Sequence, residues 1–173
     1  MLYISESMEK RILVAYATRN GSTAEIAQAI GRELEKTGTA ITVADIMTIR
    51  SLEGYTAVVI GGPLYMGRMD GLVIKFVKKY TGELSHMPVA IFAVGLAPKD
   101  PKPEAIGNAM MALETAIIPL SPVSTALFAG KLDPAKIGFL MRKFMEMAKI
   151  PYGDFRDWET IAAWAKELGD KLR

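Results

Sequence analysis

A short polar stretch near the start of the chain carries the residue types that point most clearly to chemistry. Residues 18–23 follow an apolar run and precede apolar positions at helical spacing: Ile26, Ala27, Ile30 and Leu34. Because the first turn of a helix has unpaired N–H groups and a positive dipole end, hydroxyls and a glycine there can surround a phosphate. The sequence therefore predicts a phosphate-binding loop formed by Thr18, Arg19, Asn20, Gly21, Ser22 and Thr23.

A capping box is the alternative interpretation of the same stretch, with Ser22 capping the helix and Glu25 answering three residues later. The two interpretations are compatible. The loop lacks the Gly-x-Gly-x-x-Gly of dinucleotide sites and the Gly-Lys-Ser/Thr of P-loops, so we expect a mononucleotide.

Two further loops follow apolar runs and complete the candidate site. Residues 61–67 are rich in glycine and apolar, which favours a loop that holds a flat ring, because glycines permit close backbone approach and Tyr65 offers a stacking face. The alternative is a tight turn with an incidental tyrosine. The candidate ring-binding residues are Pro63, Leu64, Tyr65, Met66, Gly67, and, after the next apolar run, Val94, Gly95, Leu96 and Ala97.

Five apolar runs alternate with helical patterns and indicate a parallel sheet. The expected strands are residues 12–15, 40–45, 55–60, 89–94 and 123–130, with helices after residue 22, at 70–82, at 102–118 and after residue 158. We expect an α/β fold of three layers, with Trp158 and Trp164 packed in the core. Residues 11–173 read as a single domain and residues 1–10 as a flexible extension.

Composition excludes several function classes. The 173-residue chain has no cysteine, a single histidine and a formal charge of +2, with Lys and Arg spread along it. We therefore expect no metal ligands, no side chain acting as a catalytic residue and no nucleic-acid partner. Apolar stretches too short for a membrane helix lead us to expect a cytoplasmic protein.

The motif Val-x-Tyr-x-Thr-x-x-Gly-x-Thr-x-x-x-Ala-x-x-Ile, from Val14 through Ile30, resembles the flavodoxin signature. Tyr-x-x-Val-Val-Ile-Gly-x-Pro, from Tyr55, is similar to the third strand and second flavin loop of that family. The resemblance implies FMN as cofactor and a five-stranded sheet in the order 2-1-3-4-5, with flavin beyond the carboxyl ends of strands one and three. It also implies a peptide at Met66–Gly67 that turns over toward the flavin N5.

A segment at residues 133–157 is longer than a simple connection and has its own helical pattern. Several lysines and arginines accompany one apolar side, which consists of Ile137, Leu140, Met141, Phe144 and Ala148. One interpretation is a helix packed on the body. The other is a basic, methionine-rich lip at residues 133–149 that lies over the flavin edge or makes peripheral contact with a membrane.

Three short stretches carry a narrower resemblance, to menaquinone-dependent protoporphyrinogen oxidases of flavodoxin type. They are residues 128–132, 141–145 and 157–159. The resemblance implies an FMN-dependent oxidoreductase that takes electrons from a reduced organic substrate, such as protoporphyrinogen IX, and passes them to a quinone. The alternative is a one-electron carrier between redox proteins. A flavodoxin-like protein without flavin conflicts with the intact hydroxyls and glycines of the loops.

Overall fold

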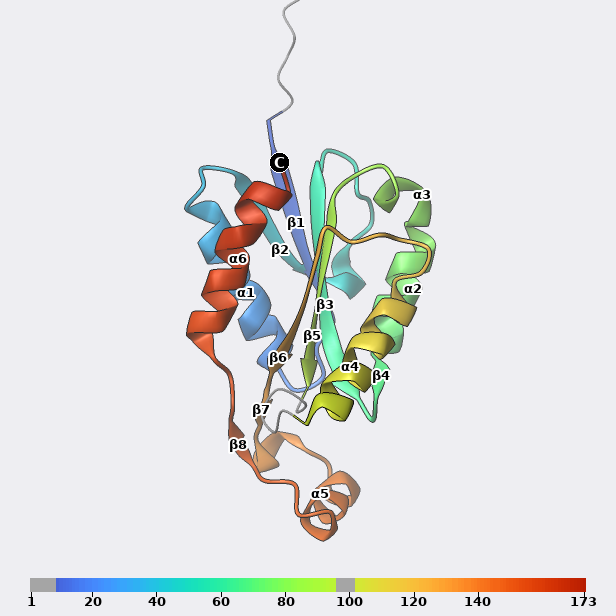
Figure 1. Ribbon diagram of the computed structural model, residues 1–173, viewed down its shortest axis with the longest axis vertical. Helices are drawn as coiled ribbons and strands as arrows, with labels where there is room; N and C mark the ends of the chain where they lie inside the picture. Colours follow the sequence, from blue (N-terminus) through green and yellow to red (C-terminus); the bar gives the residue numbers. More distant parts are fainter. Residues whose placement is uncertain (1–8, 96–101) are drawn as a thin grey trace, which may run out of the picture.

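The computed structural model describes residues 9–95 and 102–173, and its framework is a parallel sheet (Figure 1). Five strands lie in the order β2-β1-β3-β5-β6 and pair in parallel. Their bounds are β1 Arg11–Tyr16, β2 Ala40–Asp45, β3 Ala57–Tyr65, β5 Val89–Gly95 and β6 Ser124–Ala129. Along the chain this is the predicted order 2-1-3-4-5, which is confirmed. A sixth strand, β4 (Arg68–Met69), was not predicted and pairs antiparallel with the end of β3.

Helices cover both faces of this sheet and complete the three predicted layers (Figure 1). Helices α1 (Ser22–Glu35) and α6 (Trp158–Lys171) lie on one face, and α2 (Gly71–Lys79), α3 (Thr81–Leu84) and α4 (Pro103–Ala116) lie on the other. A short 3-10 helix, η1 (Ile46–Thr48), follows β2. The predicted helix at 70–82 is two helices, because the chain leaves helical geometry at Tyr80.

Alternating burial along the strands divides the core into two clusters. In β1, Leu13 and Ala15 belong to the cluster under α2 and α4, while Ile12 and Val14 belong to the cluster under α1 and α6. Trp164 packs in the second cluster as expected, with its ring 6.0 Å from that of Phe92. Both faces are therefore buried, which explains why the strands are apolar throughout.

The added segment lies beyond the carboxyl ends of the strands (Figure 1). It consists of β7 (Lys131–Leu132), η3 (Pro134–Lys136), α5 (Phe139–Met147) and β8 (Gly153–Asp154), and β7 pairs antiparallel with β8. Of the five positions on its expected apolar side, only Ile137 is buried, whereas Leu140 is 82% exposed. Within α5 the buried residue is Met145, so this side of the helix is not packed on the body at Leu140.

A further correction concerns the last helix, and a separate finding concerns membrane spans. Trp158 was expected in the core, but it is 42% exposed and lies under the guanidinium of Arg156 at 4.6 Å. Across the described ranges, we find no helix with the length and apolar character that a bilayer span needs.

Candidate functional site

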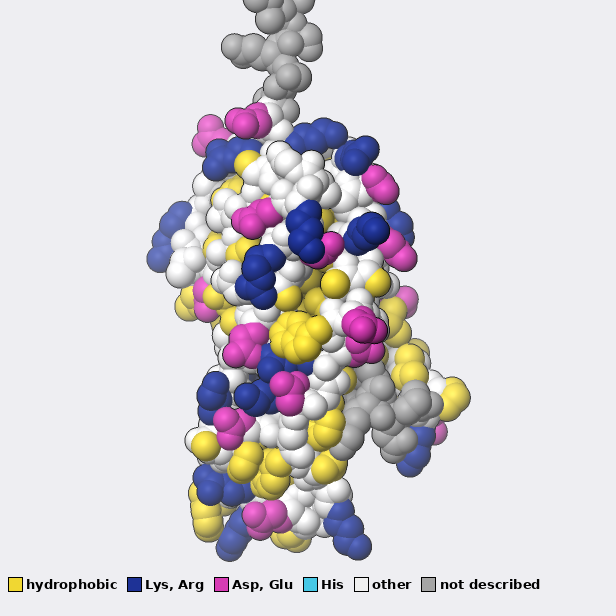
Figure 2. Space-filling model, turned by 90° about the vertical axis from the view of Figure 1, so that its left-hand side faces the viewer, with side chains coloured by type: hydrophobic (Ala, Val, Ile, Leu, Met, Phe, Trp, Pro, Cys, Tyr) yellow, Lys and Arg dark blue, Asp and Glu magenta, His cyan; other side chains and the backbone are white. Residues whose placement is uncertain are grey.

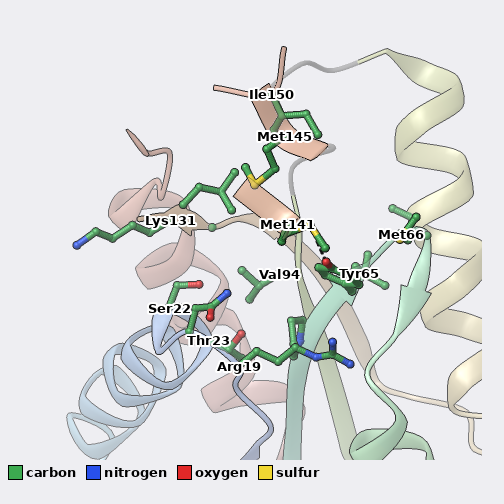
Figure 3. Close-up of a pocket in the computed structure, with 18 of the residues that line it drawn as sticks. Arg19, Ser22, Thr23, Tyr65, Met66, Val94, Lys131, Met141, Met145 and Ile150 are labelled. Atoms are coloured by element: carbon green, nitrogen blue, oxygen red, sulfur yellow. Dashed lines mark hydrogen bonds between the residues drawn. The ribbon is translucent and has the colours of Figure 1, made fainter. Parts of the chain in front are cut away.

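A cavity of about 740 Å³ opens at the carboxyl ends of β1, β3 and β5 (Figure 3). Twelve of the fifteen residues predicted for the site line it: Thr18, Arg19, Asn20, Ser22, Thr23, Pro63, Leu64, Tyr65, Met66, Gly67, Val94 and Gly95. Gly21 shapes the loop without lining the cavity, and Leu96 and Ala97 lie outside the described residues. The structure thus brings the first two predicted loops together with the end of β5, and their role in cofactor binding stays a prediction.

The first loop bends at Gly21, which precedes α1 with a φ of 90°. This left-handed conformation favours glycine, since a side chain there meets the backbone. The Gly21 N–H donates to the Thr18 hydroxyl at 3.0 Å, and the Glu25 N–H donates to the Gly21 carbonyl. The alternative interpretation of this stretch, a capping box, is not found here, because Gly21, not Ser22, caps the helix and the Glu25 carboxylate pairs with Arg156.

Unused hydrogen-bond donors point from this loop into the cavity. Thr23 is 2% exposed and lines the cavity, and within the described ranges its hydroxyl has no hydrogen-bond partner. The N–H groups of Ser22, Thr23 and Ala24 belong to the first helical turn, where no preceding turn supplies carbonyls. A hydroxyl at the wall of a cavity that has no protein partner is free to bind a ligand, so this arrangement is suited to an anionic ligand such as a phosphate.

Arg19 connects the first loop to the second. Its Nε lies 2.9 Å from Oδ2 of Asp70, and its guanidinium lies 5.0 Å above the ring of Tyr65. Asp70 is buried and also accepts a hydrogen bond from the Leu72 N–H, which caps α2. Arg19 is therefore engaged by a carboxylate and an aromatic face, so its clearest role in the structure is to hold Tyr65 in place.

The glycines of the second loop have a different role from the one expected. Gly61 and Gly62 belong to β3, where a Cβ would lie 1.9 Å from the ring of Phe92 and 2.5 Å from Val73, respectively. They permit close packing inside the fold and do not line the cavity. The turn itself is Met66–Gly67, with φ values of 48° and 74°, and joins β3 to β4 as a two-residue hairpin.

Eleven cavity residues were not named as site residues from the sequence. They come from α4 and from the chain after β6: Lys102, Ala105, Asn108, Ala109, Gly130, Lys131, Leu132, Met141, Phe144, Met145 and Ile150. The Tyr65 hydroxyl donates to the Met141 sulfur at 2.8 Å, which joins α5 to the second loop (Figure 3). For α5, the methionine-rich pattern was the sequence signal that could have indicated its cavity residues. For α4, nothing in the sequence distinguished the residues that line the cavity from the other residues of the helix.

Arg156 fastens the added segment to α1. Its guanidinium pairs with Glu25 of α1 and, at 2.7 Å, with Asp154 of β8, and only 6% of its side chain is exposed. The hydrogen bond from Arg156 lowers the pKa of Asp154 to about 2, and the same cause lowers the pKa of Glu25. The pair with Glu25 joins residues far apart in the chain and carries no sequence signal.

Relatives of known name match almost the whole chain. A protein of Escherichia coli named protoporphyrinogen IX dehydrogenase [quinone] is 28% identical over 172 residues, covering 91% of this chain and 94% of that protein. A protein of the same name from Leishmania major is 29% identical, covering 94% of this chain and 76% of that protein.

Solved flavodoxins share the fold. A Streptococcus pneumoniae flavodoxin aligns with a TM-score of 0.58 at 13% identity, covering 94% of this chain and 97% of that chain. A Fusobacterium nucleatum flavodoxin mutant bound to flavin mononucleotide aligns with a TM-score of 0.51 at 17% identity, covering 68% of each chain. The sequence model of the flavodoxin domain matches residues 13–157, so the chain belongs to the flavodoxin domain family.

Proposed function

We propose that this protein is an FMN-dependent oxidoreductase that passes electrons from a reduced organic substrate, such as protoporphyrinogen IX, to a quinone. The observation that carries the proposal is the continuity of the cavity, which runs from the loop at residues 18–23 to the apolar side chains Met141, Phe144 and Met145 of α5. Such a chamber suits a large apolar substrate beside a bound ring.

FMN fits the residues present. The Thr23 hydroxyl and the first-turn N–H groups of α1 would hold its phosphate. Tyr65 and the backbone near Gly95 would flank its ring, and no carboxylate or imidazole lies among the described residues that line the cavity. When bound, the flavin supplies the redox chemistry, and the protein supplies binding, orientation and exclusion of water.

The names of the relatives support the choice of substrate. Both relatives reported above are named for protoporphyrinogen IX and a quinone, and the shared length includes the added segment. The chain also lacks a strongly acidic charge, with a formal net charge of +2, so it has no general electrostatic attraction for basic redox partners. These two observations favour an enzyme over a carrier.

Steady-state turnover tests the proposal. Purified protein loaded with FMN is mixed anaerobically with protoporphyrinogen IX and a menaquinone analogue, and porphyrin formation is followed by fluorescence. A parallel assay replaces the porphyrinogen with a reduced redox protein. We expect porphyrin formation that requires both FMN and the quinone. Turnover with the redox protein alone would support the carrier function instead.

The outward face of α5 suggests where the quinone is met. Phe139, Leu140 and Met147 are exposed there, with Lys143 and Lys149 close by in the chain. Figure 2 shows hydrophobic and basic side chains together over the end of the molecule where the added segment lies. We propose that this face makes peripheral contact with an anionic bilayer, where a lipid-soluble quinone resides.

A further inference from the structure

The added segment brings a lysine to the back of the predicted phosphate loop. Nζ of Lys136, the last residue of η3, lies 3.6 Å from the position that a Cβ on Gly21 would occupy. Gly21 immediately precedes the N–H groups that open α1. An ammonium therefore stands beside a loop that already presents unpaired donors and the positive end of a helix dipole.

Two contacts hold Lys136 in this position. The Asn20 amide, oriented to satisfy its neighbours, donates to the Lys136 carbonyl at 3.1 Å and to the Arg19 carbonyl at 3.3 Å. The Asp133 carboxylate accepts from the Ala135 N–H at 2.9 Å and starts η3. Asn20 thus joins the loop to η3 and holds the backbone of Lys136 beside the loop. The position of the Lys136 ammonium therefore depends on this backbone contact as well as on the conformation of its flexible side chain.

The charges around the loop are arranged for an anion. Lys131 also lines the cavity, with its ammonium pointing away from the cavity interior in Figure 3, and its charge and that of Lys136 act on the first turn of α1, where they add to the main effect of Arg156 in lowering the pKa of Glu25. The Glu25 carboxylate would itself repel a phosphate, but it is already paired with Arg156. Thr23 gives independent evidence of a ligand, since the residue is 2% exposed, lines the cavity and has no hydrogen-bond partner among the described residues.

We propose that Lys136, assisted by Lys131, is a phosphate ligand that the added segment contributes to the FMN site. The inference rests on the proposed function. Its consequence is that the added segment, which lies outside the loops at the strand ends, holds part of the phosphate end of the flavin. The recognised group is a phosphate monoester dianion, which riboflavin lacks.

Flavin titrations of the apo-protein test the proposal. FMN and riboflavin affinities are measured by flavin fluorescence for the parent and for Lys136→Ala. We expect FMN affinity to fall by about tenfold, as for one partly exposed charge-assisted hydrogen bond, while riboflavin affinity stays unchanged. Lys136→Arg should keep FMN affinity within about threefold of the parent, because the charge is retained.

Lys75→Ala is the matched control, since it removes one exposed lysine from α2 on the other face of the sheet. It should leave both affinities unchanged, and salt should weaken FMN binding more steeply in the parent than in Lys136→Ala. Equal FMN affinities of the parent and Lys136→Ala would overturn the role of Lys136 but not the proposed function. The same conclusion would follow if Lys136→Ala lost affinity for FMN and riboflavin equally. A parent protein that binds no FMN would overturn the proposed function as well.

Discussion

At the scale of single residues, the site combines groups that make little sense for stability alone. A hydroxyl sits at Thr23 with 2% of the residue exposed and no partner in the described ranges, and Met66 adopts a positive φ of 48°. The positive φ of Met66 costs free energy, and the Thr23 hydroxyl is left without a protein partner at the wall of the cavity. A turn that changes conformation would explain the first feature, and a bound ligand that uses the hydroxyl would explain the second.

Thr23→Val separates binding from stability. Valine has nearly the same shape but lacks the hydroxyl, so the apo-protein should be as stable as the parent or slightly more stable. FMN affinity should nevertheless fall by about 1 kcal/mol, the typical net value of one hydrogen bond. Thermal unfolding of the apo-protein and flavin titration measure the two effects. A variant that loses stability and keeps its FMN affinity would show that the hydroxyl serves the fold.

Gly67→Val tests the predicted turn at Met66–Gly67. Valine disfavours the φ of 74° seen here by about 1 kcal/mol, whereas a flipped central peptide would allow a negative φ at this position. We therefore expect the flavin midpoint potentials to shift, because the two turn conformations change in relative free energy. Spectroelectrochemistry of the bound flavin measures the shift. Potentials identical to those of the parent would remove the proposed peptide movement.

At the scale of elements, the local sequence pattern predicted the strands of the parallel sheet and the first loop. Five apolar runs became the five parallel strands, and residues 18–23 became the turn before α1. The pattern did not predict β4, because two residues are too short to show alternation, nor the inward face of α5. Which face of a short helix turns inward depends on its tertiary contacts, here Met145 in the core and Met141 against Tyr65.

The attachment of the added segment by Arg156 gives a prediction about pH. The pKa of Asp154 falls from its usual 3.8 to about 2 because it accepts hydrogen bonds from Arg156. Since the folded pKa is below the unfolded one, this contribution to stability is present above about pH 4 and is lost as the pH falls through 2.

Arg156→Leu should remove that contribution and lower the free energy of unfolding at neutral pH by about 1 kcal/mol, the value for solvent-screened ion pairs. The difference in free energy of unfolding between parent and variant should shrink as the pH falls from 4 to 2, and denaturant titrations across this range measure it. Arg173→Leu, which removes an exposed pair with Asp170 at the end of the chain, is the control. A difference that is constant from pH 5 to pH 2 would contradict the account.

At the scale of the whole molecule, the flavodoxin framework and the added segment contribute different parts of the cavity. The framework supplies two loops and the end of β5 at one edge of the sheet, and the segment lines the cavity with α5 while it exposes an apolar face outward. Arg142 of α5 is also basic, but it is half-buried and donates to the Ile137 carbonyl at 3.3 Å. The outward cations are therefore better represented by Lys143 and Lys149.

Lys143→Glu with Lys149→Glu tests the membrane contact. Each exposed lysine near an anionic surface contributes about 1 kcal/mol, so the double variant should bind anionic liposomes much more weakly at low salt and retain its FMN. Quinone turnover in those liposomes should fall with it, and high salt should reduce the difference. Lys75→Glu with Lys78→Glu on α2 makes the same charge change elsewhere and should have little effect. Equal liposome binding of both double variants would contradict the contact through α5.

We propose that an organic substrate in the cavity reduces the bound flavin directly. Stopped-flow mixing of the oxidised, FMN-loaded protein with protoporphyrinogen IX under anaerobic conditions tests this step through the flavin absorbance. We expect the flavin to bleach at least as fast as the enzyme turns over and its colour to return when a menaquinone analogue is added. A flavin that stays oxidised with protoporphyrinogen IX, yet bleaches with a reduced redox protein, would contradict the claim.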